Sequence, residues 1–256
     1  MLLAIDIGNS ETTWGVFDGD DLRARFRTSS TTARTADEYR LLLEGFLSVF
    51  KLSADEIDSV SLCSVVPPLT GIFKSFLGQY SFHILVVGAG IKTGIRIRFD
   101  NPREIGSDRI TDAVAAHNLY GGDLIIVDMG TATTFDVVSR EAEYLGGAIA
   151  PGLIGAMESL FRNTAALPRP DIVFPEMIIG KNTISAMRSG ITFGYISLIE
   201  GMLERIQQEF GKKMKVIATG GLASFLAQKT GAFDIINPDL TLIGLKILYQ
   251  LNREDL

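Results

Sequence analysis

The sequence is poor in the residues that build disulfides, metal clusters or a basic surface. Its 256 residues include one cysteine, Cys63, and two histidines. A single cysteine excludes an internal disulfide and any cysteine-rich metal site. The two histidines have no partner at ligand spacing, so nothing points to a zinc site or a Ser-His-Asp mechanism. The chain has 24 basic and 30 acidic residues, a net charge of −6 and no block of basic residues. A nucleic-acid-binding surface therefore has no electrostatic support.

Long apolar segments are also missing. The longest stretch without a charged residue, 75–91, has 17 residues and contains several polar side chains, so it does not predict a membrane span. No basic region precedes the apolar run at the N-terminus, so no targeting signal is predicted. We therefore expect a cytoplasmic protein with neither membrane nor nucleic-acid partners. The 46% hydrophobic content is that of an ordinary globular chain able to bury a large core.

Short apolar runs that end in glycine-rich turns alternate with helical patterns along the chain. This alternation is typical of α/β proteins. We expect strands at 2–7, 12–17, 59–65, 83–87, 124–127, 133–138 and 216–218. We expect helices at 36–51, 69–78, 108–119, 151–161, 183–210 and 239–251, with a further helix after the turn at 219–221.

An internal repeat organises the chain. Residues 2–12 align with residues 124–134 at a constant offset of 122, and each copy has an apolar strand, then Asp-x-Gly, then hydroxyl side chains. Two buried strands can resemble each other by chance, but an Asp and a Gly matched in one register favour two half-domains of one fold facing each other across a cleft. We expect an N-terminal half at 1–115 and a C-terminal half at 116–256.

Each copy of the repeat carries a candidate phosphate loop. Gly8 lets an anion approach backbone N–H groups, and the hydroxyls that follow it can donate further hydrogen bonds. Asp6, at the strand end, can hold Mg²⁺ directly or through water. The segment 128–134 repeats this composition, and two such loops can hold a polyphosphate between them. A structural Asx-turn explains either loop equally well on its own, whereas P-loop and dinucleotide folds lack support because their glycine motifs are absent.

Further motifs carry candidate chemistry. Asp108 can accept a proton from a substrate hydroxyl, and Arg109 can pair with a carboxylate, although a helix N-cap beside an exposed arginine explains both equally simply. The segment 216–221 suits a nucleobase and ribose, or a plain strand-to-helix corner. The glycine-rich segment 146–152 is expected to line the cleft or a subunit contact. Residues 181–183 cap the long helix and can present a hydroxyl or N–H group to a ligand.

Together these segments resemble the type III pantothenate kinase family of the acetate-and-sugar-kinase and actin-like superfamily. The segments that carry the resemblance occur in family order over nearly the whole chain, at 6–10, 99–102, 106–109, 128–133, 146–152, 182–190 and 218–221. The resemblance implies a fold of two ribonuclease-H-like halves. It also implies ATP-dependent phosphorylation of pantothenate, the first step towards coenzyme A, with Mg²⁺, a monovalent cation such as K⁺ or NH₄⁺, and a homodimeric assembly.

The resemblance further implies roles for single residues. Asp108 matches the general base, and Asp128 matches the position that binds the monovalent cation. ATP contacts are expected from Asp6, Ile7, Gly8, Asn9, Ser10, Glu11, Thr12, Thr13 and Thr131. Pantothenate contacts are expected from Phe99, Gly106, Ser107, Asp108, Arg109 and Thr183. In the family, the counterpart of Thr183 reaches the site from the partner subunit.

The sequence departs from the family pattern at three positions. Ser10 stands where threonine is usual and Ser107 where alanine is usual, and both changes are mild. Phe99 stands where tyrosine is common, which removes a hydroxyl from an expected substrate contact. Two other functions remain open. One is an actin-like phosphotransferase or phosphohydrolase for a different acceptor, which has no evident need of the segment 106–109. The other is a non-catalytic ATP-binding regulator, since some relatives are described as transcriptional accessory proteins.

Overall fold

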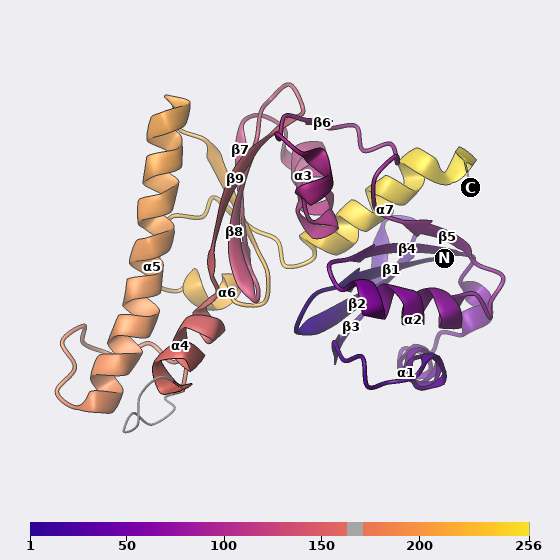
Figure 1. Cartoon of the computed structure of the whole chain (residues 1–256), viewed down its shortest axis with the longest axis horizontal. Helices are drawn as coiled ribbons and strands as arrows, with labels where there is room; N and C mark the ends of the chain where they lie inside the picture. The colour runs from indigo at the N-terminus through magenta and orange to yellow at the C-terminus, as the bar shows by residue number, and fades with distance from the viewer. Residues whose placement is uncertain (163–170, 256) are drawn as a thin grey trace. The chain divides into compact units, whose positions relative to one another are not determined.

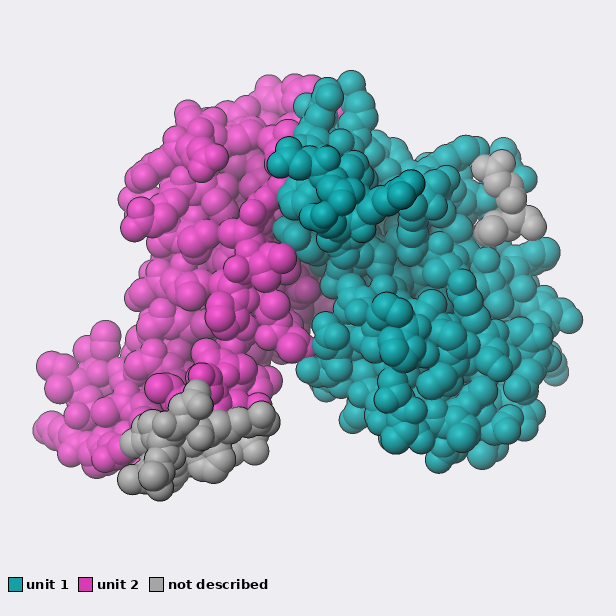
Figure 2. All heavy atoms as spheres, in the orientation of Figure 1, with its two compact units in different colours: residues 1–120, 142–144, 239–256 teal, residues 121–141, 145–238 magenta. Residues whose placement is uncertain are grey.

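The computed structural model describes residues 1–162 and 171–255, and the chain divides into two compact units (Figures 1 and 2). Unit 1 comprises Met1–Tyr120, Ala142–Tyr144 and Asp239–Leu256, and unit 2 comprises Gly121–Glu141 and Leu145–Pro238. The halves expected from the repeat, 1–115 and 116–256, stay a prediction about the duplicated fold. The compact units differ from those halves chiefly because unit 1 also contains the C-terminal helix.

Unit 1 is built on a mixed sheet with the strand order β3-β2-β1-β4-β5. The central strand β1 (Leu2–Ile7) pairs antiparallel with β2 (Glu11–Asp18) and parallel with β4 (Ser59–Ser64). The edges are β3 (Asp21–Ser29) and β5 (His83–Val86). Because β1 is almost wholly buried, its sequence is a near-continuous apolar run broken only by Asp6 near its end.

Helices cover both faces of the unit 1 sheet (Figure 1). On one face, α1 (Ala36–Val49) and α2 (Pro67–Leu77) pack against the odd-numbered side chains of β1 in an aromatic-rich core. On the other face lie α3 (Ser107–Tyr120) and α7 (Leu240–Asn252), which pack against each other and against β4. A Cβ at Gly244 of α7 would collide with the backbone of α3, so this glycine permits the close approach of the two helices. α7 thereby fixes the helix that carries Asp108.

Unit 2 repeats the strand order of unit 1. Its strands run β9-β8-β7-β10-β11, with β7 (Leu124–Met129) antiparallel to β8 (Ala132–Val138) and parallel to β10 (Lys215–Thr219). The strands that flank these three are β9 (Glu143–Pro151) and β11 (Ile235–Ile236). The short β6 (Arg96–Ile97) of unit 1 adds a sixth strand beside the Glu143–Tyr144 end of β9. The order 9-8-7-10-11 corresponds strand for strand to 3-2-1-4-5, which supports the internal repeat on topology as well as on sequence.

The constant offset of 122 is wrong beyond the turn of the hairpin. In unit 1 the last pair before the turn is Ile7 with Thr12, whereas in unit 2 it is Met129 with Thr133. The second turn is therefore one residue shorter. The structural counterpart of Thr12 is Thr133, and not Thr134 as the ungapped alignment predicts.

One face of the unit 2 sheet is covered by helices α4 (Leu153–Arg162), α5 (Thr183–Phe210) and α6 (Ala223–Leu226). The long α5, orange in Figure 1, has the bounds expected from the sequence. It begins at an Asn182 capping box and ends at Gly211, whose φ of 80° is the left-handed conformation that glycine adopts easily at a helix C-terminus. None of the helices in the described ranges is long and apolar enough to cross a membrane.

Several strands were not expected from the sequence. In β3, exposed arginines alternate with buried residues, and they form ion pairs that neutralise this edge of the sheet. β9 contains residues 146–151 of the glycine-rich segment 146–152, so that segment is mostly strand. The following helix begins at Leu153, two residues later than predicted. The two-residue strands β6 (Arg96–Ile97) and β11 are too short to leave a periodic signal.

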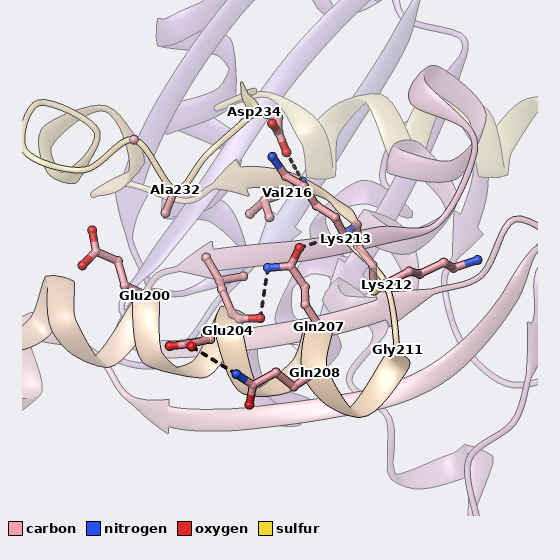
Figure 3. A pocket seen from close by; sticks show the side chains of 13 residues that line it. Glu200, Glu204, Gln207, Gln208, Gly211, Lys212, Lys213, Val216, Ala232 and Asp234 are labelled. Atoms are coloured by element: carbon pink, nitrogen blue, oxygen red, sulfur yellow. Dashed lines mark hydrogen bonds between the residues drawn. The ribbon is translucent and has the colours of Figure 1, made fainter.

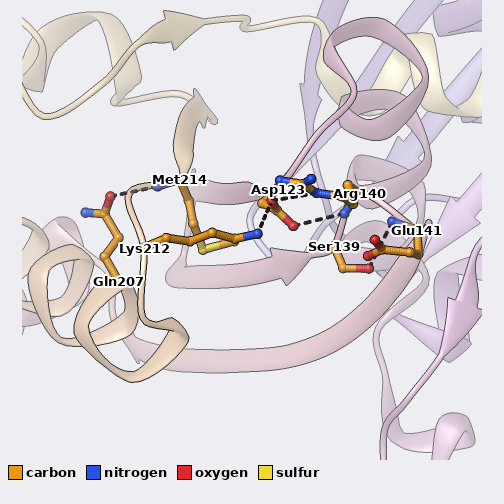
Figure 4. Close-up of polar contacts among 7 residues, drawn as sticks. All are labelled: Asp123, Ser139, Arg140, Glu141, Gln207, Lys212 and Met214. Carbon is orange, nitrogen blue, oxygen red and sulfur yellow. Dashed lines mark hydrogen bonds and ion pairs between the residues drawn. The ribbon is translucent and has the colours of Figure 1, made fainter.

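A buried carboxylate ties together the start of β7 and two neighbouring segments of unit 2 (Figure 4). Asp123 is 7% exposed and accepts from Lys212 at 2.6 Å and from Arg140 at 2.9 Å. Burial alone would raise the pKa of Asp123, but the hydrogen bonds from Lys212 and Arg140 outweigh it and lower the pKa to about 2. The network lies at the opposite end of β7 from Asp128, so we assign it to the stability of the unit.

Candidate active site

The first candidate loop follows β1, near whose end Asp6 lies beside Cys63. The two residues are register partners in parallel strands, and the Cys63 thiol donates to Asp6 Oδ1 at 3.2 Å. Burial raises the pKa of Asp6 to about 7; the bond from Cys63 lowers it, and the charge of Asp108 raises it further. Burial also raises the pKa of the Cys63 thiol, which keeps the thiol protonated as a donor. The environment thus disfavours a charge on Asp6 unless a cation or another donor is supplied.

The turn after β1 presents only part of the expected ATP-binding set. Its exposed residues are Asn9, Ser10 and Glu11. The Gly8 N–H closes the turn by donating to the Glu11 carbonyl oxygen at 3.1 Å. Thr12 is fully buried, and its hydroxyl pairs with the Ser30 hydroxyl at 2.9 Å. The Thr12 hydroxyl therefore stabilises the hairpin within unit 1. The contacts of Thr12 and of the buried Ile7 with ATP stay predictions.

Asp108 is held at the N-terminus of α3 by two neighbours. The Ser107 hydroxyl accepts from the Ser64 N–H and donates to the Ser64 carbonyl oxygen, both at 3.1 Å, which fastens the helix to the end of β4. A Cβ at Gly106 would collide with the Asp108 carboxylate, so a larger residue there would displace this side chain. Asp108 Oδ1 also accepts from the Arg109 N–H at 2.8 Å. The result is a half-buried carboxylate that acts electrostatically on Asp6.

Two aromatic rings, those of Tyr144 and Phe99, lie near Arg109 in unit 1. The Arg109 guanidinium lies 5.9 Å from the ring centroid of Tyr144, and the Phe99 ring lies 6.3 Å from the same centroid. Phe99 and Arg109 are sequence-predicted acceptor contacts, whereas Tyr144 was missed. Its only sequence signal is its position two residues before the glycine-rich segment.

The second candidate loop follows β7 in unit 2. Asp128 is in register with Thr219 of β10, as Asp6 is with Cys63 in unit 1. Gly220 has a φ of 88°, and a Cβ there would collide with the Asp128 carboxylate. Thr131 is exposed at the turn, and its carbonyl oxygen accepts from the Gly152 N–H at 3.2 Å. Asp128 and Thr131 thus lie at one edge of the unit 2 sheet.

Tyr195 is a second residue that sequence reasoning missed. This side chain of α5 is buried, and its hydroxyl is hydrogen-bonded to the hydroxyl of Thr133 in the second hairpin. Burial raises the pKa of Tyr195, and the charge of Asp128 raises it further. A single tyrosine in a helical pattern is indistinguishable from an ordinary core residue in the sequence.

The carboxylates at the two strand ends fit cations that are completed by a bound phosphate. Across residues 1–162 and 171–255, no group of three or more His, Cys, Asp or Glu side chains forms a metal site by itself. Asp6 and Asp128 each stand at the end of a central strand, and Gly220 leaves open the space beside Asp128 that any side chain would fill. Mg²⁺ is typically held by one or two carboxylates together with phosphate oxygens and water. The donor set therefore suits a cation that arrives with a nucleotide.

A groove of about 670 Å³ in unit 2 is separate from these loops (Figure 3). It lies along the C-terminal half of α5 and the start of β10, whereas Gly220 follows the end of that strand. Its polar groups bind one another: Gln208 donates to Glu204 at 3.0 Å, and Asp234 accepts from the Val216 N–H at 2.8 Å. Among the residues that line it, Val216 alone belongs to a sequence-predicted segment, 216–221, so we do not assign the chemistry to this groove.

The predicted site residues are divided between the units. Unit 1 holds the first loop, Phe99 and the segment 106–109, while unit 2 holds Asp128, Thr131 and Thr183. Within unit 1 the structure brings Asp6 and Asp108 into electrostatic contact and places both Phe99 and Arg109 next to Tyr144. Thr183 is exposed in the first turn of α5.

Two sheets that share one order of five strands, each with an Asp-x-Gly turn after its central strand, define an actin-like fold. The chain belongs to the type III pantothenate kinase family, which matches residues 2–205. A type III pantothenate kinase of Dehalococcoides mccartyi strain CBDB1 is 51% identical over 253 residues, which cover 98% of this chain and 96% of the relative.

Solved structures share the fold at low sequence identity. A Campylobacter jejuni protein described as a Baf family transcriptional activator has a TM-score of 0.64 at 20% identity, over 98% of this chain and 99% of its own. A Sinorhizobium meliloti protein described as a 2-dehydro-3-deoxygalactonokinase has a TM-score of 0.57 at 12% identity, over 98% and 96%. These likenesses identify the actin-like fold and carry no information about the substrate of this chain.

Proposed function

We propose that this chain transfers the γ-phosphate of ATP to pantothenate, giving 4′-phosphopantothenate in the first step of coenzyme A synthesis in the cytoplasm. The observation that carries the proposal is the construction around Asp108 in a chain of this family. Ser107 and Gly106 fix and accommodate a carboxylate that has Asp6 as its electrostatic neighbour and Arg109 next to it. A carboxylate that can act as a base, next to a guanidinium that can pair with a carboxylate, suits a kinase for a small carboxylated alcohol.

Asp108 acts as the general base in this proposal. Its carboxylate accepts the proton of the primary hydroxyl of pantothenate as that oxygen attacks the γ-phosphorus, and the bond from phosphorus to the departing ADP oxygen breaks. Arg109 pairs with the pantothenate carboxylate, for which its planar fork is suited. Phosphoryl transfer depends mainly on positioning and charge stabilisation, so holding the acceptor at both ends is the chief contribution of these residues.

The two loops bind ATP in this proposal. The backbone of the first loop, from Gly8 to Thr13, and Thr131 in the second loop contact the phosphates. Asp6 would hold Mg²⁺ directly or through water, and the bound ion would neutralise phosphate charge. The raised pKa of Asp6 fits this role. Burial makes the negative charge of this carboxyl costly, and a bound cation would remove most of that cost.

Asp128 binds the monovalent cation in the proposal, since Gly220 leaves space beside its carboxylate. We expect pantothenate-dependent ATP consumption to fall about tenfold when K⁺ is replaced by Na⁺ at constant ionic strength. The Asp128→Asn variant is the control, because it should show similar, low rates in both salts. Equal rates of the unmodified protein in K⁺, NH₄⁺ and Na⁺ would refute the cation site and leave the kinase assignment standing.

We also propose a homodimer formed through unit 2, in which Thr183 of the partner subunit reaches the acceptor. Large apolar side chains are exposed there at Ile149, Ile154, Val173, Met177, Ile178, Ile179 and Ile184. The nearby exposed face of α5 includes Ala186, Gly190, Gly194 and Ser197. Exposed apolar area of this extent marks an interaction surface, and small residues let another element approach closely.

Sedimentation velocity tests the homodimer with a matched pair of variants. Ile179 in unit 2 and Val49 in unit 1 are both 76% exposed. We expect Ile179→Asp to sediment as a monomer and Val49→Asp to remain dimeric, because a buried unpaired charge is costly only at the interface. A monomeric unmodified protein at micromolar concentration would contradict the assembly.

A further inference from the structure

Tyr144 is fully buried against the two side chains expected to contact the acceptor. Its exposed fraction is 0%. The guanidinium carbon of Arg109 lies 5.9 Å from the centroid of its ring, within the range of a cation–π interaction. The Phe99 ring lies 6.3 Å from the same centroid at an interplanar angle of 59°. The three side chains come from different segments, and all belong to unit 1.

The position of Tyr144 is set by strand pairing and not by Arg109. Tyr144 is in register with Ile97 in the parallel pair β6 and β9, and its carbonyl oxygen accepts from the Arg98 N–H at 2.8 Å. The Arg98 guanidinium donates to Glu143 at 2.7 Å, which adds an ion pair beside this strand pair. The tyrosine ring therefore stands as a fixed surface against which a longer and more flexible side chain can be ordered.

We propose that Tyr144 is a positioning residue that holds the Arg109 guanidinium in the orientation that receives the carboxylate of pantothenate. An arginine has many rotamers, so ordering it before substrate arrives lowers the entropic cost of binding. The ring face provides the attraction, and the phenolic hydroxyl is not required for it. The inference rests on the proposed function, because it assumes that Arg109 binds the acceptor.

Steady-state kinetics with pantothenate and ATP varied separately tests the proposal. Tyr144→Leu should raise the KM for pantothenate about tenfold, leaving the KM for ATP and kcat within about twofold, because the contact orders only the acceptor-binding side chain. Tyr144→Phe keeps the ring and should behave like the unmodified protein. Tyr39→Leu is the matched control: Tyr39 is also fully buried in unit 1 and also has an arginine, Arg34, 5.9 Å from its ring centroid.

A second series of variants tests the proposal even if Tyr144→Leu fails to fold. Phenylalanines carrying one, two or three fluorines at position 144 keep the shape of the ring while weakening the negative potential of its face. The KM for pantothenate should rise with each added fluorine. A KM that does not change along the series, or a Tyr144→Phe variant as impaired as Tyr144→Leu, would overturn the proposal.

Arg109→Ala separates failure of this inference from failure of the proposed function. If Arg109→Ala raises the KM for pantothenate while the Tyr144 variants leave it unchanged, Arg109 binds the acceptor without help from Tyr144, and only the inference falls. If Arg109→Ala leaves that KM unchanged, the assignment of Arg109 in the proposed function falls, and the inference falls with it.

Discussion

Replacing Asp108 with asparagine is expected to lower kcat about 10³-fold while ATP binding stays within about twofold of the unmodified protein. The amide has nearly the shape of the carboxylate, and its oxygen can still accept from the Arg109 N–H, so the local structure should persist. It cannot take up the proton of the acceptor hydroxyl. Turnover by a coupled assay and calorimetric titration with a non-hydrolysable ATP analogue measure the two effects.

Asp37→Asn is the matched control for this prediction. Asp37 lies in the first turn of α1 as Asp108 lies in the first turn of α3, but Asp37 is exposed and outside the site. Both substitutions remove a negative charge from a helix N-terminus, which costs about 0.3–1 kcal/mol. Only the Asp108 variant should lose turnover. An Asp108→Asn protein with more than about a tenth of normal activity would show that Asp108 is not the base.

Replacing Asp6 with asparagine is expected to stabilise the ligand-free protein at pH 8 by about 2–4 kcal/mol while removing turnover. Burial raises the pKa of Asp6 from 3.8 to about 7, so the folded state holds this proton more tightly than the unfolded state does. The unfolded state therefore binds fewer protons between these values, and the free energy of unfolding falls as the pH rises from about 4 to 7. Above pH 7 the destabilisation is complete.

Urea denaturation at several pH values measures this effect. The stability curves of the Asp6→Asn variant and the unmodified protein should converge near pH 4 and separate as the pH rises to 8. Asp20→Asn supplies a control of opposite sign, because the contact with Lys246 lowers the pKa of Asp20 and its removal should destabilise the protein slightly at neutral pH. A difference between Asp6→Asn and the unmodified protein that does not vary with pH would show that Asp6 is not held in this environment. A substitution that makes the protein more stable and removes its activity is typical of a residue that is retained for function.

The parts of the fold that the sequence predicted well are those whose residues are buried on both faces or on one long face. β1 and β7 are continuous apolar runs, and α5 has clear signals at both ends. β3 was missed although its exposed arginines alternate with buried residues, which is the period of a half-buried strand. β9 was missed because its glycines have no side chain that could show a period. The position of α7 in unit 1 follows from its packing against α3, which depends on tertiary contact and not on its place in the sequence.

The candidate site residues that the sequence offers and the structure brings together are those that are close in sequence or repeated. Gly106, Ser107, Asp108 and Arg109 form one segment, and the structure gives each of them a defined contact. Cys63 is fully buried, and its hydrogen bond to Asp6 was not predicted, because it arises from the pairing of β1 with β4. Tyr144 was missed for the same kind of reason, since only the pairing of β6 with β9 brings it to Phe99 and Arg109.

Phosphorus-31 NMR of the purified protein with ATP and Mg²⁺ in K⁺ buffer, with and without pantothenate, tests the central claim most directly. The account predicts that ADP and a new phosphomonoester signal appear together only when pantothenate is present, with mass spectrometry identifying 4′-phosphopantothenate. The Asp108→Asn protein should give neither signal over the same time. Folded, ATP-binding protein that forms no phosphopantothenate would contradict the kinase assignment and favour another acceptor or a regulatory role.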